Sequence, residues 1–79
     1  MKIRYSADVD ALYITLKDTD IIESDEVSDG VIMDYDNNGN VVGIEILWVS
    51  KKVDINQIII QAIDKDSVIF EPVNVDSVM

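Results

Sequence analysis

The sequence feature that most constrains the fold is a period-two alternation of side chains through the first 48 residues. In ALYITL (11–16), one side carries three aliphatic side chains and the other carries Ala11, Tyr13 and Thr15. The segments VIMDYD (31–36) and VVGIEILW (41–48) repeat this alternation. Successive side chains of a β-strand point to opposite faces, whereas a helix repeats every 3.6 residues. The alternation therefore predicts strands with one apolar face.

Turn signals separate these segments. Asp29-Gly30 and the run NNGN (37–40) each precede a predicted strand, and glycine supplies the positive φ that tight hairpin turns need. Residues 2–5 predict a further short strand. The acidic residues 21–28 predict an edge strand, where charge discourages the docking of another sheet. We therefore expect four or five antiparallel strands joined in sequence as a meander.

The pattern changes after Lys51. Residues 54–64 (DINQIIIQAID) place five apolar side chains on one helical face: Ile55, Ile58, Ile59, Ala62 and Ile63. Asp54 suits the N-cap of this helix, and residues 67–73 predict a last strand. The expected fold class is α+β: an antiparallel β-meander of four or five strands, one short helix packed on a face, and a candidate C-terminal strand. We expect one domain, 1–79, with the meander in 3–50 and the helix plus C-terminal extension in 51–79.

The net charge of −10 bears on partners and location. Ten of the 16 acidic residues lie between Asp8 and Asp36, where Lys17 is the single cation. Such a field repels phosphate backbones and anionic membranes but attracts a basic protein, so we expect no direct nucleic-acid or membrane binding. The alternative is that acidity only keeps a small protein soluble. No apolar run approaches the ~20 residues of a spanning helix, and MKIRYS begins no signal peptide, so the expected location is cytoplasmic.

Composition argues against catalysis and against cofactors. The 79 residues include no cysteine and no histidine, which removes thiolate sites, the usual general base and the commonest zinc ligand. No phosphate-binding glycine motif and no nucleophile–base pair is present. We therefore expect a protein that is not an enzyme, with no cofactor, no catalytic residue and no metal site. Because so short a chain has a thin core, we also expect a homodimer.

The stretch DYDNNGNVVGIE (34–45) matches the D-x-[DN]-x-[DN]-G-x₅-E pattern of an EF-hand calcium loop. An EF-hand loop lies between two helices, whereas the residues on either side of this stretch alternate as strands do. We therefore interpret it as a hairpin turn built from Asn37, Asn38 and Gly39. Weak cation or small-ligand binding by Asp34, Asp36 and Glu45 stays open as an alternative.

Four residues are candidate contacts for a partner: Asp25, Glu26, Asp29 and Trp48. The three acids belong, with Glu23, to a cluster that serves either as a solvated charge run protecting an edge or as an interaction surface. Trp48 either packs at the junction of helix and sheet or acts as a binding hot spot. The three tyrosines are expected to flank the core with their hydroxyls in water.

Two stretches, YSADVDALYITL (5–16) and DGVIMDYDNNGNVVGIEIL (29–47), resemble the small proteins of domain-of-unknown-function family 2283. The matching positions are Tyr5, Asp10, Ala11, Leu12, Tyr13, Ile14, Leu16, Gly30, Val31, Ile32, Asp34, Asp36, Gly39, Val42, Gly43, Ile44, Glu45, Ile46 and Leu47. The resemblance covers about residues 3–50, and the sequence departs from the pattern at WVSKK. It implies a small sheet-plus-helix fold in a prokaryotic accessory protein. It implies no activity, and an antitoxin-like role only by association with neighbouring toxin-like proteins.

Three functional hypotheses follow. The first is a non-enzymatic, antitoxin-like interaction module that binds a basic protein, and the −10 charge supports it. The second is an acidic nucleic-acid mimic that occupies a basic groove, which requires carboxylates spaced along one exposed ridge. The third is a weak metal- or small-ligand-binding module.

Overall fold

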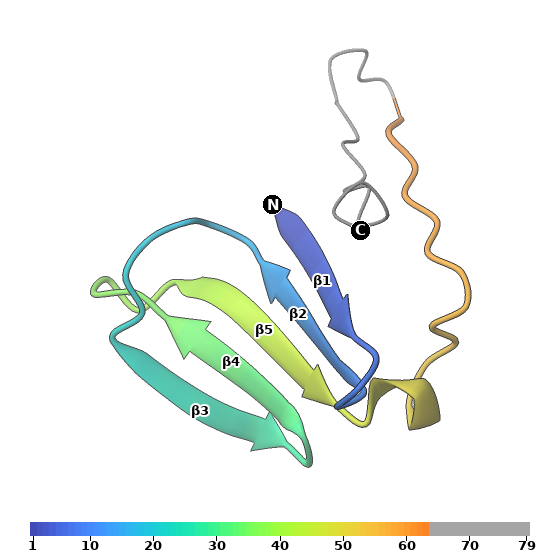
Figure 1. The fold of residues 1–79 in the computed structure, drawn as a ribbon. Coiled ribbons are helices and arrows are strands. Elements are labelled where there is room, and N and C mark those ends of the chain that lie inside the picture. The colour runs from blue at the N-terminus through green and yellow to red at the C-terminus, as the bar shows by residue number, and fades with distance from the viewer. Residues whose placement is uncertain (64–79) are drawn as a thin grey trace, which may run out of the picture.

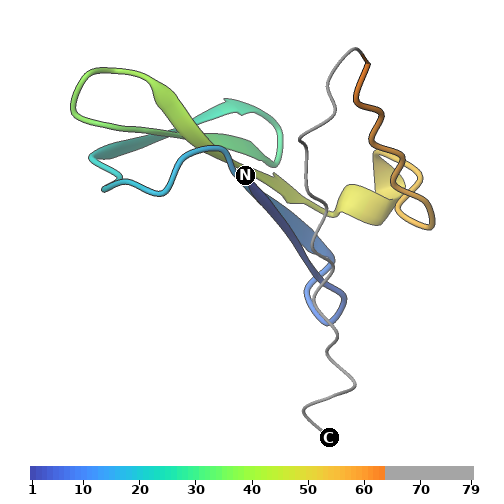
Figure 2. The ribbon, with the colours of Figure 1, turned by 90° about the horizontal axis from the view of Figure 1, so that it is seen from above.

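A computed structural model of the protein describes residues 1–63, which form one open antiparallel sheet of five strands (Figure 1). The strands are β1 (Lys2–Ser6), β2 (Ala11–Thr15), β3 (Glu23–Ser28), β4 (Val31–Tyr35) and β5 (Val41–Leu47). A single 3-10 turn, Val49–Lys51, follows β5. Figure 2 shows this turn and residues 52–63 leaving from the end of β5.

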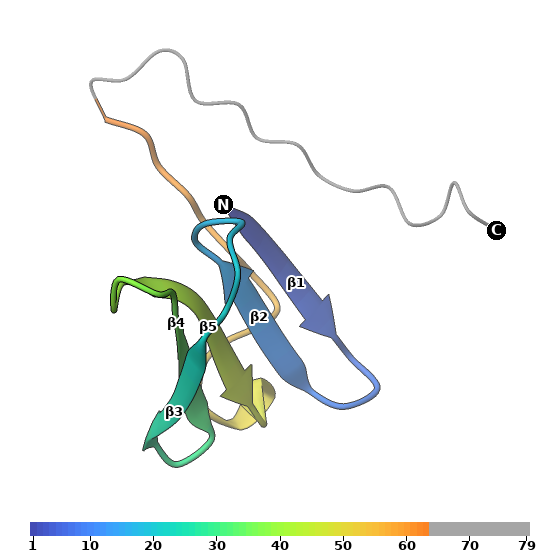
Figure 3. The ribbon, with the colours of Figure 1, turned by 90° about the vertical axis from the view of Figure 1, so that its left-hand side faces the viewer.

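The strand order is β1-β2-β5-β4-β3. Strands β3, β4 and β5 are joined by two hairpins, and residues 16–22 carry the chain from β2 past the ends of β5 and β4 to the far edge. Strand β2, which precedes these three strands in the chain, lies beside the last of them, and the four together form a Greek key. The side view in Figure 3 shows β1 and β3 running in clearly different directions, as the twist of a sheet requires.

The strand register arranges side chains in rows that cross the sheet. The apolar face carries two rows: Ile3, Ile14, Ile44, Met33 and Asp25, and Tyr5, Leu12, Ile46, Val31 and Ser28. The polar face also carries two: Lys2, Thr15, Gly43, Asp34 and Ser24, and Arg4, Tyr13, Glu45, Ile32 and Glu26. The prediction of antiparallel strands with one apolar face is thus confirmed.

The core is thin, because only three apolar side chains of the described residues are buried: Leu12, Val42 and Val49. Val42 lies beside an irregularity in the β4–β5 register, and its carbonyl accepts hydrogen bonds from the N–H groups of Leu16 (2.8 Å) and Lys17 (3.2 Å). The chain between β2 and β3 therefore closes over this end of β5. Val49 lies in the 3-10 turn at the other end.

The predicted α+β class is wrong, since the described residues contain no α-helix. This part of the chain therefore also has no helix long and apolar enough to cross a membrane. Asp54 does accept a hydrogen bond from the N–H of Asn56 (3.0 Å), as an N-cap would, but no helix follows up to residue 63. A helix must nucleate at a free-energy cost, and the β-branched isoleucines here propagate it poorly. The predicted strand at 67–73 lies outside the described residues.

The predicted meander also gives the wrong strand order, although five antiparallel strands are present. A meander would place β2 beside β3, whereas β2 pairs with β5 and β3 lies at an edge. Pairing β2 with β5 sets an apolar strand face beside another, Leu12 opposite Ile46 and Ile14 opposite Ile44. The exposed and acidic β3 could not supply that partner.

The DYDNNG stretch forms the predicted hairpin turn, and its carboxylate explains why. Asp36 Oδ1 accepts hydrogen bonds from the N–H groups of Asn38 and Asn40, both 2.9 Å long. The Asp36 carbonyl accepts a third from Gly39, whose φ of +81° needs a residue without Cβ. The bonds to the carboxylate, that from Asn40 foremost, favour its ionised form and hold the pKa of the Asp36 carboxyl below its ordinary value.

Replacing Asp36 by Ala should therefore loosen the β4–β5 hairpin. We expect the variant to unfold at a lower urea concentration, because the turn loses the acceptor of two backbone N–H groups. Asn37→Ala, in the same turn, is the matched control, because Asn37 is exposed. Urea denaturation followed by circular dichroism measures both, and equal losses would contradict the role given to Asp36.

Candidate functional site

The most unusual group in the described residues is the carboxylate of Asp34, which is 6% exposed and is their one buried charged or polar side chain. Its Oδ2 accepts a hydrogen bond from the Tyr13 hydroxyl (2.6 Å), and its Oδ1 accepts one from the Ser24 hydroxyl (2.5 Å). A buried carboxylate costs several kcal/mol unless such bonds compensate it. We call these three residues the polar cluster.

The polar cluster depends on a glycine in β5. Gly43 is the direct partner of Asp34 in β4 and of Thr15 in β2. A Cβ at Gly43 would lie 2.5 Å from Tyr13 Oη and 3.0 Å from Asp34 Oδ2. The missing side chain is therefore what lets Tyr13 reach across β5 to β4. With Ser24 from β3, four of the five strands take part in this arrangement.

The polar cluster leaves Tyr13 a weak acid. Its hydrogen bond to Asp34, burial, and the negative charges of Asp34 and Glu45 together raise the pKa of Tyr13 to about 12. A phenol with this pKa is no better as a nucleophile or base than one in water. Both oxygens of the Asp34 carboxylate already accept hydrogen bonds from protein groups. This geometry suits a fixed structural contact between strands.

A second carboxylate joins the β1–β2 turn to the 3-10 turn that follows β5. Asp10, in the β1–β2 turn, accepts hydrogen bonds from the Tyr5 hydroxyl (3.0 Å), the Ser50 N–H (3.2 Å) and the Ser50 hydroxyl (2.7 Å). Its carbonyl accepts a fourth from the N–H of Val49 (3.0 Å). The bonds from Ser50, foremost, lower the pKa of the Asp10 carboxyl. Because Tyr5 lies on the apolar face, these bonds bring the 3-10 turn to the end of that face.

The four predicted partner contacts do not form one cluster. Glu26 Oε2 accepts a hydrogen bond from the N–H of Gly30 (2.9 Å) and so closes the β3–β4 turn, which also contains Asp29. The Trp48 ring lies against the same turn, since a Cβ at Gly30 would be 3.2 Å from two of its ring carbons. Asp25 is separate, because its register opposite Met33 places it on the apolar face.

Trp48 does not pack on a helix, as one interpretation of the sequence had it. It adopts a left-handed conformation with φ of +51°, which turns the chain from β5 into the 3-10 turn. The ammonium of Lys52 lies 5.3 Å from the centre of its ring, a cation–π contact, and donates to the Leu47 carbonyl at 2.7 Å. The Trp48 side chain is still 50% exposed, so much of the ring is accessible.

The residues of the alternative cation site do not converge. The Asp34 carboxylate lies in the polar cluster, Asp36 bonds its own turn, and Glu45 pairs across the strands with Tyr13 and Ile32. Within residues 1–63, no three acidic side chains are grouped so that they could hold a metal ion.

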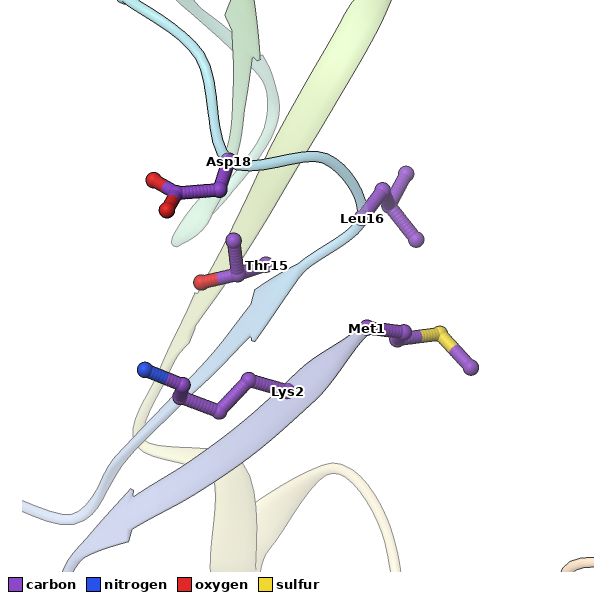
Figure 4. Close-up of a pocket in the computed structure, with 5 residues that line it drawn as sticks. All are labelled: Met1, Lys2, Thr15, Leu16 and Asp18. Carbon is purple, nitrogen blue, oxygen red and sulfur yellow. The ribbon is translucent and has the colours of Figure 1, made fainter. Parts of the chain in front are cut away.

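One shallow hollow of about 210 Å³ lies where β1 begins and β2 ends. Figure 4 shows Lys2, Thr15 and Asp18 on one side of these strands, and Met1 and Leu16 on the other. The side chains that line it do not point toward a common centre, so it offers no ligand a convergent set of groups.

A family comparison covers the whole sheet. The model of the family described as "Protein of unknown function (DUF2283)" matches residues 2–50, from the start of β1 into the 3-10 turn. The chain belongs to this family. The resemblance seen in the sequence is thus confirmed, and the family brings no activity with it. Searches among curated proteins and among solved structures find no match.

For this DUF2283 chain, sequence reasoning missed the polar cluster. Alternation did place Asp34 on the face opposite Val31 and Met33, but the strand order decides which side chains surround it. Tyr13 reaches Asp34 only because β2 lies beside β5, a pairing the expected meander lacked. The interpretation of the tyrosine hydroxyls as water-exposed is therefore wrong for Tyr13, whose hydrogen bond to Asp34 is partly buried. A usable signal was a strand glycine, which often marks close approach of another group.

Gly43→Ala should destabilise this member of the family, because the added methyl meets the Tyr13 hydroxyl and the Asp34 carboxylate. We expect a loss of about 1–3 kcal/mol in the free energy of unfolding, as for other overpacked sites. In a Tyr13→Phe background the closest atom is gone, so the same substitution should cost less. A double-mutant cycle by urea denaturation measures the difference. An equal cost in both backgrounds would contradict the contact.

The raised pKa of Tyr13 predicts a loss of stability at alkaline pH. The folded state holds the phenol proton more tightly, so this stabilisation is complete below the ordinary pKa of 10 and disappears as pH rises to about 12. In an ultraviolet titration, the tyrosine that ionises last should be absent from Tyr13→Phe and retained in Tyr5→Phe. The stability of Tyr13→Phe should fall less over the same pH range. A late tyrosine that persists in Tyr13→Phe would refute the assignment.

Proposed function

We propose that this chain is a non-enzymatic, antitoxin-like interaction module whose acidic edge strand β3 binds a basic segment of a protein partner. The observation that carries the proposal is the exposure of β3. It is one of the two edge strands, and all six of its residues are exposed. Three of the six are acidic: Glu23, Asp25 and Glu26.

The edge position supplies a binding mode. An edge strand has unpaired backbone N–H and C=O groups on its outer side, and an extended segment can add to the sheet by bonding to them. Acidic side chains along β3 oppose the addition of another acidic strand, including β3 of a second copy. A segment rich in lysine or arginine gains from the same charges. The charge therefore selects the partner, and the backbone supplies the directional bonds.

Trp48 supports a contact at one end of β3. Its half-exposed ring lies against the turn that joins β3 to β4, and tryptophan is enriched among residues that dominate binding energy. A segment that runs along β3 past Asp29 would reach this ring. Asp25, Glu26, Asp29 and Trp48 thus remain the predicted contacts, with Glu26 limited by its bond to Gly30.

A non-enzymatic role is consistent with how the carboxylates are used. Asp10, Asp34 and Asp36 each accept hydrogen bonds from protein groups, so they hold turns and strands together. A module of this kind would act by covering a basic surface, as an inhibitor of a basic toxin or nuclease does.

Affinity capture from the native cell extract tests this proposal with two charge-neutralised variants. Wild type should recover a basic protein, and Glu23→Gln/Asp25→Asn should recover less, by about two- to fivefold for each exposed charge pair lost. The control is Asp8→Asn/Asp18→Asn, which removes the same charge from the β1–β2 side of the sheet. Capture should also weaken at higher salt.

Two results would reject the binding mode. Equal loss in the control would mean that net charge, and not β3, attracts the partner. Recovery of the protein alone, at low and moderate salt, would mean that there is no such partner. Competition by duplex DNA for the captured protein would favour the nucleic-acid-mimic hypothesis instead.

A further inference from the structure

The tip of the β4–β5 turn carries the pair Asn38-Gly39, and both residues are exposed. A Cβ placed at Gly39 would meet no heavy atom within 4 Å beyond the adjacent residues. Every other asparagine of the chain is followed by a residue with a side chain. Gly39 therefore offers an asparagine side chain an unhindered backbone nitrogen.

An asparagine before a glycine can undergo a reaction that needs no enzyme. Asparagine is a thermally labile residue, because the next backbone nitrogen can attack its side-chain carbonyl carbon. A side chain on the next residue crowds the five-membered ring that forms, and glycine has none. The exposure and the freedom of the turn then decide whether the reaction occurs in the folded protein.

We propose that Asn38 is a site of spontaneous deamidation, which passes through a cyclic succinimide with Gly39. Hydroxide takes the N–H proton of Gly39, the nitrogen bonds to Cγ of Asn38, and the Cγ–Nδ2 bond breaks. The departing nitrogen takes a proton from water and leaves as ammonia. Water then opens the ring at either carbonyl carbon and yields aspartate or isoaspartate, with no oxidation or reduction. The inference goes beyond the proposed function, because it concerns the β4–β5 turn and not β3.

The turn at Asp29-Gly30 provides the contrast. An aspartate before a glycine can form the same ring with loss of water. Gly30, however, is buried, and its N–H donates to Glu26 Oε2 at 2.9 Å. A Cβ at Gly30 would also lie 3.2 Å from two carbons of the Trp48 ring. Ring closure there would have to displace these contacts, so the structure favours Asn38 over Asp29.

Hydrogen bonds within the β4–β5 turn slow the reaction without blocking it. The N–H of Gly39 donates to the Asp36 carbonyl at 3.1 Å, and this bond must open before the nitrogen can attack. Asp36 Oδ1 also accepts the N–H groups of Asn38 and Asn40. Local opening costs least where few groups are buried, and residues 37–40 are all exposed. The bonds to Asp36 are therefore what restrains the rate.

Isoaspartate would change the turn more than aspartate would. Ring opening at the main-chain carbonyl carbon routes the backbone through the former side chain and adds one CH₂ group to it. The added carbon lies between the N–H groups of Asn38 and Asn40, which now share Asp36 Oδ1 as acceptor at 2.9 Å each. Both bonds cannot keep this length, so the isoaspartate form has a looser β4–β5 hairpin.

Incubation of the full chain in buffer tests the site. The folded protein should convert over days at mildly alkaline pH, and faster as pH rises. Peptide mapping and an isoaspartate-specific methyltransferase should locate the product at position 38. Asn38→Gln should abolish it, since glutamine would need a six-membered ring, and Asn40→Gln in the same turn should convert as wild type does. Asp36→Ala should convert about two- to tenfold faster, the factor that corresponds to one hydrogen bond.

A stability measurement separates the added charge from the added backbone carbon. Asn38→Asp supplies the carboxylate without the extra CH₂ group and should unfold at nearly the same urea concentration as wild type. The isoaspartate form, purified by ion exchange from the incubated protein, should unfold at a lower urea concentration than both.

The following results would overturn the proposal. A folded chain that stays unconverted, while the same chain in urea converts, would mean that the hydrogen-bonded turn protects Asn38. Conversion that persists in Asn38→Gln, or that begins at Asp29, would place the reaction elsewhere. An isoaspartate form as stable as Asn38→Asp would contradict the loosening of the hairpin.

Discussion

The buried carboxylate of Asp34 is the contact on which the order of the sheet depends. Hydrogen bonds within the ladders hold neighbouring strands only in pairs, whereas Asp34 in β4 is bonded by Tyr13 from β2 and by Ser24 from β3. The bond from Tyr13 passes over β5 at Gly43. Because an uncompensated buried charge is costly, a packing that separated these residues would lose more than an ordinary surface hydrogen bond.

The same carboxylate specifies strand register. A slip of one residue in β4 would move Asp34 to the apolar face and Met33 to the polar face. The slip would also take Asp34 away from Gly43, the one position in β5 where Tyr13 can pass. A small sheet with a thin core gains specificity from such a group, since apolar contacts alone tolerate several registers. Asp36 also helps to specify the register, because its hydrogen bonds fix the turn between β4 and β5.

The local features of the fold could be predicted from the sequence, and the long-range ones could not. Alternation identified the strands, and Asp29-Gly30 and Gly39 identified the turns, because both depend on residues adjacent in the chain. The pairing of β2 with β5 depends on apolar faces about 30 residues apart, and nothing between Leu12 and Ile44 specifies it locally. The polar cluster could not be predicted for the same reason, because it depends on this pairing. Asp54 shows that a local signal can also be insufficient. Its carboxylate makes the hydrogen bond expected of an N-cap, yet the poor helix formers after it do not continue as a helix.

The distribution of charge limits how copies of this chain can meet at the edges of the sheet. Pairing of β3 with β3, or of β1 with β1, would bring like charges together, so copies of this chain are discouraged from joining at equal edges. A basic segment meets no such barrier at β3, so the same acidic charges that discourage a second copy at this edge favour the proposed partner.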